Sequence, residues 1–213
     1  MGHMVEKNLA LRGIECALAS EDITSVDPAL AKECVCIDFT TPDAFRANYR
    51  FLASSFKAVV VGTTGWNDIR DEVVRAFEEA GTTMIYASNF SIGVNVFFAA
   101  ADCLSRMLAD AGGYGAYVEE KHHCHKLDRP SGTAKSIAAI VEANMGAAPD
   151  VAAVRCGEIA GIHTLGFEGL NDRITLTHEA FSREGFAAGA VEAALRTEGL
   201  TGVHEFKDII FQK

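Results

Sequence analysis

Residues 119–136 read EEKHHCHKLDRPSGTAKS, which is the densest run of reactive side chains in the chain. Tyr117 and Val118 lie just before it as the expected end of a strand, and the apolar sequence after it is typical of a helix. We therefore expect a loop that connects a strand to a helix, a common position for binding and catalytic residues. Ser131 or Thr133 would cap this helix, and the free N–H groups of its first turn would form an anion site.

The same stretch carries a family resemblance. The pattern Glu-x-His-His-x-x-Lys-x-Asp-x-Pro-Ser-Gly-Thr-Ala over residues 120–134 resembles the signature of the dihydrodipicolinate reductase family. Similarity to that family extends over essentially the whole chain. It implies an enzyme of lysine and diaminopimelate biosynthesis, an oxidoreductase that reduces 4-hydroxy-tetrahydrodipicolinate to tetrahydrodipicolinate with NADH or NADPH.

The resemblance also assigns roles to side chains. It implies that His122 is the general acid/base and that Lys126 supplies charge to catalysis and to a substrate carboxylate. The residues that it assigns to dicarboxylate binding are His123, Lys126, Ser131, Gly132 and Thr133. Hydride addition to a conjugated imine leaves negative charge that must be protonated, so an imidazole beside an ammonium group suits this chemistry.

A zinc site is an alternative interpretation of residues 122–125, which read HHCH. Because adjacent side chains of an extended segment point to opposite faces, only His122 with Cys124, or His123 with His125, would converge. The sequence offers no second Cys/His pair at zinc-finger spacing, so we expect no metal site. A purely structural histidine cluster is the other alternative.

Composition bounds the class of protein. The chain has 213 residues, of which 49% are hydrophobic and 23% charged, as in ordinary globular domains. A net charge of −10 without a basic cluster argues against nucleic acid as a partner. No apolar run approaches the ~20 residues that span a bilayer, and no signal peptide is evident. Six cysteines without a metal or disulfide pattern favour reduced thiols in a cytoplasmic protein.

The first half of the chain alternates buried strands with helices. The predicted strands are 14–19, 34–39, 57–61 and 83–87, and the predicted helices include 1–13, one opened by Thr41 and Pro42, and one from Asn67 or Asp68 to Ala80. Such alternation predicts a doubly wound, parallel, Rossmann-like sheet. We expect a nucleotide-binding domain over residues 1–90, and the resemblance implies that residues 185–213 complete it.

The chain begins on a helix, whereas such a sheet normally begins with a strand and a glycine-rich turn. Met1-Gly2, Val5-Glu6 and Arg12-Gly13 resemble the end of the family's phosphate-binding turn and its helix. We therefore expect the sheet to lack its first strand and most of that turn, unless Met-Gly-His-Met is a cloning remnant. An alternative function follows, a cofactor-impaired remnant that binds a dicarboxylate without turnover. A metal-dependent hydrolase is a less favoured one.

Candidate cofactor residues lie after the predicted strands. Gly62-Thr63-Thr64-Gly65 follows a buried strand at the edge where such sheets bind ligands, although it could be a simple tight turn. Glu21 or Asp22 could take ribose hydroxyls, or be a solvated turn carboxylate. Together with the resemblance, this predicts cofactor contacts by Gly2, Glu21, Asp22, Phe39, Thr40, Gly62, Thr63, Thr64, Asn89 and Phe90.

Residues 91–184 have a different pattern, with a long helix to about Ala111 and strands at 151–155, 163–168 and 173–179. This predicts an α+β domain, and the resemblance implies that it serves substrate binding and oligomerisation. The alternation of Ile174–His178 indicates one wet face on the sheet. The resemblance implies a homotetramer built through this sheet. His163 is interpreted as a buried, hydrogen-bonded residue.

Overall fold

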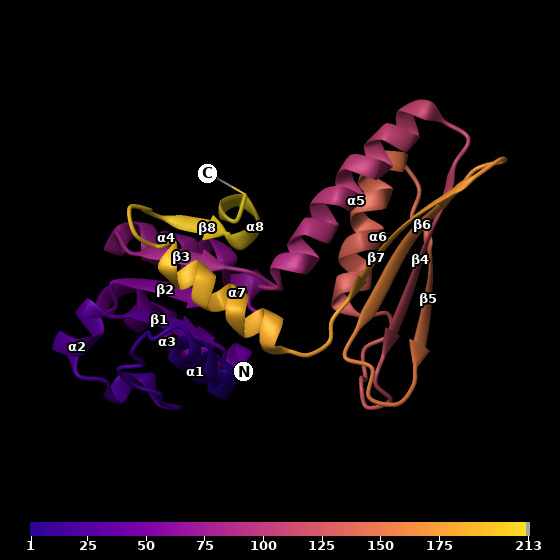
Figure 1. Cartoon of the computed structure of the whole chain (residues 1–213). Helices are drawn as coiled ribbons and strands as arrows, with labels where there is room; N and C mark the ends of the chain where they lie inside the picture. The colour runs from indigo at the N-terminus through magenta and orange to yellow at the C-terminus, as the bar shows by residue number, and fades with distance from the viewer. Residues whose placement is uncertain (212–213) are drawn as a thin grey trace. The chain divides into compact units, whose positions relative to one another are not determined.

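The computed structural model describes residues 1–211, which divide into two compact units (Figure 1). One unit consists of Met1–Ile92 with the chain from Glu184 onward, and the other of Gly93–Arg183. The expected boundaries were 90/91 and 184/185, and the last two residues of the predicted 185–213 segment lie outside the described range. The nucleotide-binding and substrate-binding roles of the two units stay predictions.

The first unit is built around a parallel sheet. Its elements are α1 (Gly2–Leu11), η1 (Ile23–Ser25), α2 (Pro28–Glu33), β1 (Val35–Asp38), α3 (Pro42–Ser55), β2 (Ala58–Val61), η2 (Asn67–Ile69), α4 (Arg70–Ala80), β3 (Thr83–Tyr86), α7 (Glu184–Leu195), β8 (Val203–Glu205) and α8 (Phe206–Ile209). The strand order is β1-β2-β3-β8, and every neighbouring pair is parallel. The C-terminal segment thus returns to this sheet by pairing β8 with β3.

Both faces of this sheet are covered by helices. Val59 and Val61 of β2 pack with α3 and α4, whereas Val60 packs with α7 and α8 on the opposite face. A strand that is buried on both faces needs apolar side chains in both phases, which explains the continuous Ala-Val-Val-Val run. The predicted parallel sheet with helices on both faces is confirmed.

Some of the helices in this unit begin where the sequence predicted, and others do not. Thr41 caps α3, where its Oγ1 accepts a hydrogen bond from the N–H of Ala44 at 3.2 Å, and Pro42 is the first helical residue. The helix expected from Asn67 or Asp68 instead begins at Arg70, after the 3₁₀ turn η2. Asp27 caps the short helix α2, which the sequence analysis did not predict.

The strand predicted over residues 14–19 is wrong. This segment has no strand hydrogen bonding in the described chain, and its side chains are exposed except for Ile14. Of this segment, only Ile14 packs on a hydrophobic cluster, the one in which Val5 of α1 meets residues of α7 and β1. Hydrophobicity alone does not make a parallel strand, because the segment needs a ladder partner and cover on both faces.

The second unit contains a mixed sheet and two helices. Its elements are α5 (Ile92–Ala111), β4 (Gly115–His122), α6 (Gly132–Met145), β5 (Asp150–Arg155), β6 (Ile162–Glu168) and β7 (Arg173–Glu179). In the order β5-β4-β6-β7, β4 is parallel to β5, and the other neighbours are antiparallel. Helices α5 and α6 lie along one face (Figure 1), where Phe97, Ile137 and Val118 share a core. The predicted helix-and-sheet domain is confirmed.

The alternation predicted for β7 is also confirmed. Ile174 and Leu176 pack on the core of the unit, whereas Thr175 and Thr177 are exposed. The opposite face of the sheet is therefore polar and wet, with Thr164 and Thr177 hydrogen bonded at 3.0 Å across two strands.

Strand β4 is longer than predicted. It continues through His122, so Glu119–His122 belong to the sheet and not to the loop. Ladders to β5 on one side and β6 on the other hold these charged residues in extended conformation. The polar composition of residues 119–122 did not indicate a buried strand. The strand forms nevertheless, because a carboxylate that has hydrogen-bond partners can occupy a buried position.

Helix α5 has 20 residues and, by length and composition alone, is apolar enough to cross a membrane. The expectation that no such apolar run exists was therefore wrong. Phe97, Ala101 and Leu108 of α5 are buried in the core of the second unit, which explains the apolar composition as that of a core helix.

Gly189 of α7 provides a test of packing in the first unit. A Cβ at this position would overlap the backbone carbonyl oxygen of Phe90, which cannot move as a flexible side chain does. Gly189→Ala should therefore lower the free energy of unfolding by about 1–3 kcal/mol in urea titrations. Gly185→Ala in the same helix is the control, because its Cβ would meet only Ser91 Oγ at 3.9 Å. Equal stability of the two variants would contradict this packing.

Candidate active site

Glu120 is the centre of the polar cluster in the second unit. Val118, Glu120 and His122 are the buried residues of β4, on the face that Val118 shares with the core under α5 and α6. The side chain of Glu120 is 0% exposed. A buried carboxylate is stable only when it is paired and fully hydrogen bonded, so its partners define the site.

Arg155 is the main partner of Glu120. Its Nη1 and Nη2 atoms donate to Oε2 at 2.9 Å and Oε1 at 2.8 Å, which is a bidentate arrangement. The parallel register of β4 and β5 brings Arg155 beside His122. Arg155 also donates to the carbonyl oxygens of Lys126 at 3.3 Å and Asp128 at 2.7 Å. One guanidinium group therefore connects β4, β5 and the loop before α6.

Two further donors complete the environment of Glu120. The backbone N–H of Ser131 donates to Oε1 at 3.2 Å, and Nδ1 of His122 lies in hydrogen-bond contact with Oε2. Burial by itself would raise the pKa of Glu120, but the hydrogen bonds from Arg155, His122 and Ser131 lower the pKa below its ordinary value. Glu120 is thus an ionised carboxylate at neutral pH.

His122 is oriented by this carboxylate. With Nδ1 bound to Glu120, Nε2 is the ring atom that remains for proton transfer. A Cβ on Gly161 would lie only 3.0 Å from Nε2, so glycine at this position leaves room beside that atom. Burial lowers the pKa of His122, with Glu120 opposing this and the charges of Lys126 and Arg155 adding to it. A protonated His122 would therefore release its proton readily.

His163 is the third buried member of the cluster, paired opposite Glu120 in the β4–β6 register. Its Nε2 lies 3.1 Å from Ser131 Oγ, and its ring centroid is 5.0 Å from that of His122. Burial lowers the pKa of His163 to about 4, with the charge of His122 contributing, so the ring is neutral. The predicted hydrogen bond is present at Nε2, but Nδ1 is buried without a partner in the described residues.

Lys126 and Asp128 lie in the loop before α6. Their Nζ and Oδ1 atoms are 2.7 Å apart, and the hydrogen bond from Lys126 lowers the pKa of Asp128. The N–H of Gly132, the first residue of α6, also lowers that pKa. Ser131 is the actual N-cap, since its Oγ accepts from the N–H of Ala134 at 3.2 Å. The expected anion site at this helix start thus contains a carboxylate of the chain itself.

The predicted substrate residues are therefore brought together in part. His122, Lys126, Ser131 and Gly132 converge around β4 and the first turn of α6, and Thr133 lies in that first turn. His123 follows β4, and its Nδ1 is buried without a partner in the described chain. An unsatisfied buried nitrogen is unfavourable unless water or a ligand binds there, which fits a polar ligand.

In the first unit, several predicted cofactor residues meet at the carboxyl ends of β1 and β2. The N–H of Gly62 donates to the carbonyl oxygen of Asp38 at 2.8 Å, and a Cβ on Gly62 would overlap the ring of Phe39. Phe39 in turn contacts Phe90, with ring centroids 6.1 Å apart. Oγ1 of Thr63 and Oδ2 of Asp38 are buried without partners in the part of the chain that the structure describes.

These orphaned oxygens fit a polar ligand at the edge where parallel sheets bind cofactors. Thr40 belongs to the same edge, because its N–H donates to Asp38 Oδ1 at 3.1 Å. Thr64 is exposed in the turn after Thr63, and Oδ1 of Asn89 accepts from the N–H of Ser91 at 2.8 Å. The residues at these strand ends are therefore compatible with a nicotinamide cofactor.

The remaining cofactor predictions have weaker structural support. Glu21 and Asp22 do not follow a strand, which removes the argument for their contact with ribose. Asp22 instead caps η1, with Oδ1 accepting from the N–H of Thr24 at 3.0 Å. Gly2 is the first residue of α1, with open space where a Cβ would be.

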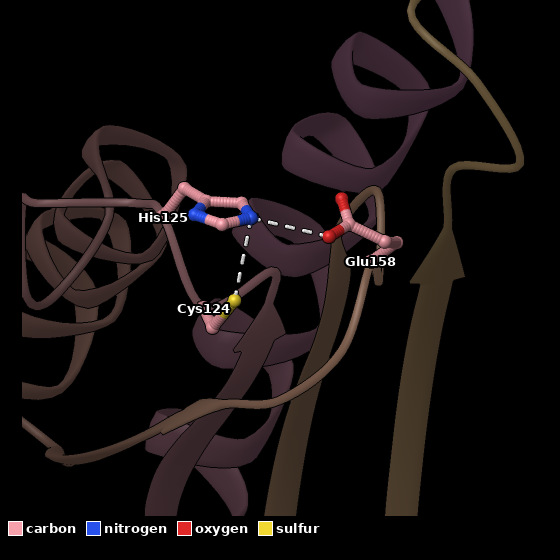
Figure 2. A group of neighbouring side chains, drawn as sticks. All are labelled: Cys124, His125 and Glu158. Carbon is pink, nitrogen blue, oxygen red and sulfur yellow. Dashed lines mark hydrogen bonds and ion pairs between the residues drawn. The ribbon is translucent and has the colours of Figure 1, made fainter.

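Cys124 and His125 do not follow the expectation that adjacent side chains point to opposite faces. Because β4 ends at His122, both residues lie in a turn, and their side chains converge on Glu158 (Figure 2). Cys124 Sγ is 3.5 Å from His125 Nε2, which is 3.2 Å from Glu158 Oε1. The alternation of an extended segment does not apply beyond the end of the ladder.

The fold and the site define a two-unit α/β protein, with a parallel sheet of the nucleotide-binding type and a second unit that carries a buried carboxylate–histidine cluster. Its sequence matches two family descriptions, "Dihydrodipicolinate reductase, N-terminus" over residues 4–90 and "Dihydrodipicolinate reductase, C-terminus" over residues 93–210. The chain therefore belongs to the dihydrodipicolinate reductase family. This confirms the identification made from residues 120–134 and makes the chain an oxidoreductase of lysine and diaminopimelate biosynthesis.

Individual relatives agree with this family. A 4-hydroxy-tetrahydrodipicolinate reductase of Neisseria gonorrhoeae is 34% identical over 93% of this chain and 79% of the relative. One of Methanopyrus kandleri is 39% identical over 86% of this chain and 74% of the relative. The solved, dipicolinate-bound dihydrodipicolinate reductase of Paenisporosarcina sp. TG-14 has a TM-score of 0.80 at 18% identity, over 98% of this chain and 94% of that one. At that identity the likeness shows the fold.

Three residues of this cluster had no assigned role in the sequence analysis. Glu120 was noticed only as part of the motif, Arg155 as the end of the predicted strand 151–155, and His163 as a buried residue. The alternation of Val118, Glu120 and His122 was a usable signal for a buried carboxylate. The pairing of Glu120 with Arg155 depends on strand register, which the sequence does not specify.

The buried imidazole of His163 predicts a pH dependence of stability. The pKa of His163 in the folded chain, about 4, lies below the ordinary value of 6.5. The neutral ring therefore makes its full contribution to the free energy of unfolding above pH 6.5, and this contribution is lost as the pH falls toward 4. This lowering of the pKa of His163 corresponds to roughly 3 kcal/mol of unfolding free energy. His163→Gln should therefore show a shallower loss of unfolding free energy across this window in urea titrations. His3→Gln, at an exposed histidine, should keep the slope of the unsubstituted chain. Identical slopes for both variants would contradict the buried neutral state.

Proposed function

We propose that this chain reduces 4-hydroxy-tetrahydrodipicolinate with NADH or NADPH and that His122 donates the proton. The observation that carries the proposal is the Glu120–His122 pair, held by Arg155 beside the start of α6 in a chain of this reductase family. The dipicolinate bound to the Paenisporosarcina reductase is a cyclic dicarboxylate of the same kind as the proposed substrate.

His122 is suited to deliver a proton from Nε2. In the imidazolium form both nitrogens carry hydrogen, Nδ1–H donates to Glu120, and Nε2–H is the acid. The lowered pKa of His122 favours release of that proton, and the remaining neutral ring keeps its Nδ1–H bond to Glu120. Glu120 thus holds the ring orientation and the tautomer through the whole transfer, as a positioning residue.

Lys126 and the first turn of α6 are proposed to bind the substrate carboxylates. Lys126 already pairs with a carboxylate, that of Asp128, which supports a role for this ammonium group and the helix start in binding such a group together. A substrate carboxylate would replace Asp128 in this contact, and His123, Ser131 and Thr133 would contribute polar contacts. Lys126 would then also stabilise the negative charge that develops before protonation.

The nicotinamide cofactor, when bound, supplies the hydride. The residues proposed to hold it are those at the carboxyl ends of β1 and β2, above all Phe39, Gly62 and Thr63. The orphaned oxygens of Asp38 and Thr63 support this assignment.

We further propose a homotetramer assembled through the wet face of the β5-β4-β6-β7 sheet, in the cytoplasm. The polar ladder of Thr164 and Thr177 and the pairing of Lys121 with Glu119 at 3.0 Å on that face are compatible with such an interface.

Turnover tests the proposal directly. The chain should oxidise NADH or NADPH in the presence of freshly generated 4-hydroxy-tetrahydrodipicolinate. His122→Gln should lower kcat by about 10²–10⁴, because the proton donor is lost, while KM changes much less. His3→Gln, at an exposed histidine of the first unit, should retain full activity. Activity of His122→Gln equal to that of the unsubstituted chain would contradict the role of His122. Dipicolinate binding without turnover by the unsubstituted chain would favour the alternative function.

Cofactor binding is tested at Thr63. Thr63→Val removes a hydroxyl that has no partner in the described chain, so stability should change little while binding of NADH or NADPH weakens by up to about tenfold. Thr82→Val is the matched control. The Thr82 hydroxyl donates to the carbonyl oxygen of Ala53 at 2.6 Å, so its loss should lower stability and leave cofactor binding intact. Nicotinamide fluorescence and urea titration measure the two effects. Unchanged cofactor binding in Thr63→Val would remove Thr63 from the site.

A further inference from the structure

We propose that Cys124, His125 and Glu158 form a surface site for a zinc ion, separate from the His122 chemistry. The three side chains offer a thiolate, an imidazole and a carboxylate, which are the ligand types that zinc takes in proteins. Their ligand atoms all lie within 4.8 Å of one another. Figure 2 shows the three groups directed toward one another from two turns.

Two of the three ligand-to-ligand distances match the edges of a zinc tetrahedron. Zinc–sulfur bonds of about 2.3 Å and zinc–nitrogen or zinc–oxygen bonds of about 2.0–2.2 Å place neighbouring ligand atoms roughly 3.3–3.6 Å apart. The Sγ to Nε2 separation is 3.5 Å, and the Nε2 to Oε1 separation is 3.2 Å. Glu158 and His125 are exposed, so small side-chain rotations would bring Glu158 to the same distance from the sulfur.

The backbone holds the two turns in register. β4 and β5 are adjacent and parallel, and the hydrogen-bonded pattern continues past their ends. The N–H of Cys156 donates to the carbonyl oxygen of His122 at 2.9 Å, and that of Cys124 donates to the carbonyl oxygen of Gly157 at 3.1 Å. The two ligand-bearing turns are therefore preorganised before any ion binds, which reduces the entropy cost of binding.

The proposed zinc site is separate from the buried histidine cluster. Its three ligands are exposed at the surface, whereas His122 and His163 are buried and engaged with Glu120 and Ser131. We assign the fourth position of the tetrahedron to water. Lys126 lies one residue after His125, so a bound ion would fix the turn at the beginning of the loop that carries the proposed substrate contacts.

The experiment is a zinc titration of the full chain, reduced and freed of metal by a chelator that is then removed. Calorimetry should show one zinc ion per chain, and cobalt in its place should give the near-ultraviolet charge-transfer absorption of a thiolate ligand. Cys124→Ser should abolish that absorption. His125→Gln and Glu158→Gln should each weaken zinc binding by at least about tenfold. Cys156→Ser, at an exposed neighbouring cysteine outside the cluster, should bind zinc as the unsubstituted chain does.

Three results would overturn the proposal: no stoichiometric zinc binding, unchanged affinity in Cys124→Ser, or loss of binding in Cys156→Ser alone. The readouts are independent of turnover, so failure here leaves the reductase proposal intact. Conversely, a chain without reductase activity could still bind zinc at these three residues.

Discussion

The buried ion pair of Glu120 and Arg155 is the interaction on which the second unit's site depends. Both side chains are nearly inaccessible to solvent, and two parallel hydrogen bonds connect them. Removing two charges from water is costly, and their attraction offsets that cost only with complete hydrogen bonding. Here the carboxylate of Glu120 also accepts a hydrogen bond from the N–H of Ser131 and is hydrogen bonded to His122. Replacing one partner alone would leave an uncompensated buried charge, a loss of about 3–5 kcal/mol.

This pair also explains why separate segments meet with defined geometry. Arg155 donates to two carbonyl oxygens of the loop before α6, and Glu120 accepts from the N-cap residue of α6. The start of the helix, the loop and two strands are therefore positioned by a single charged contact. The role proposed for His122 as proton donor requires that rigidity, because displacement by about 1 Å can cost a large factor in rate.

Local signals allowed much of the fold to be predicted from the sequence. The apolar runs of β1, β2 and β3 and the caps at Thr41 and Ser131 depend on neighbouring residues only, and the structure has them as expected. The wrong strand at 14–19 shows the limit of that reasoning. Its apolar residues resemble those of β2, but a ladder partner is a property of the fold and not of the segment.

The site was predictable to the extent that it lies within one motif. His122, Lys126 and Ser131 are close in sequence, so spacing alone places them together. Arg155 and His163 lie 35 residues and 32 residues from their partners Glu120 and Ser131, and the register of β4 with β5 and β6 makes those contacts. A shift of one residue in either register would move these side chains to the wet face of the sheet. Sequence reasoning cannot specify such contacts without the strand pairing.

The two carboxylates of the motif have different partners, and the difference suits different tasks. Glu120 is paired with an arginine, whose planar group forms two fixed bonds in a buried position. Asp128 is paired with a lysine in a contact that is 49% exposed on the carboxylate side. A lysine ammonium is a flexible point charge, and an exposed pair contributes little stability, so this contact can exchange at small cost. The permanent pair therefore fixes the proposed proton donor His122, whereas the exchangeable pair would leave a cation and a helix start available to the proposed substrate carboxylate.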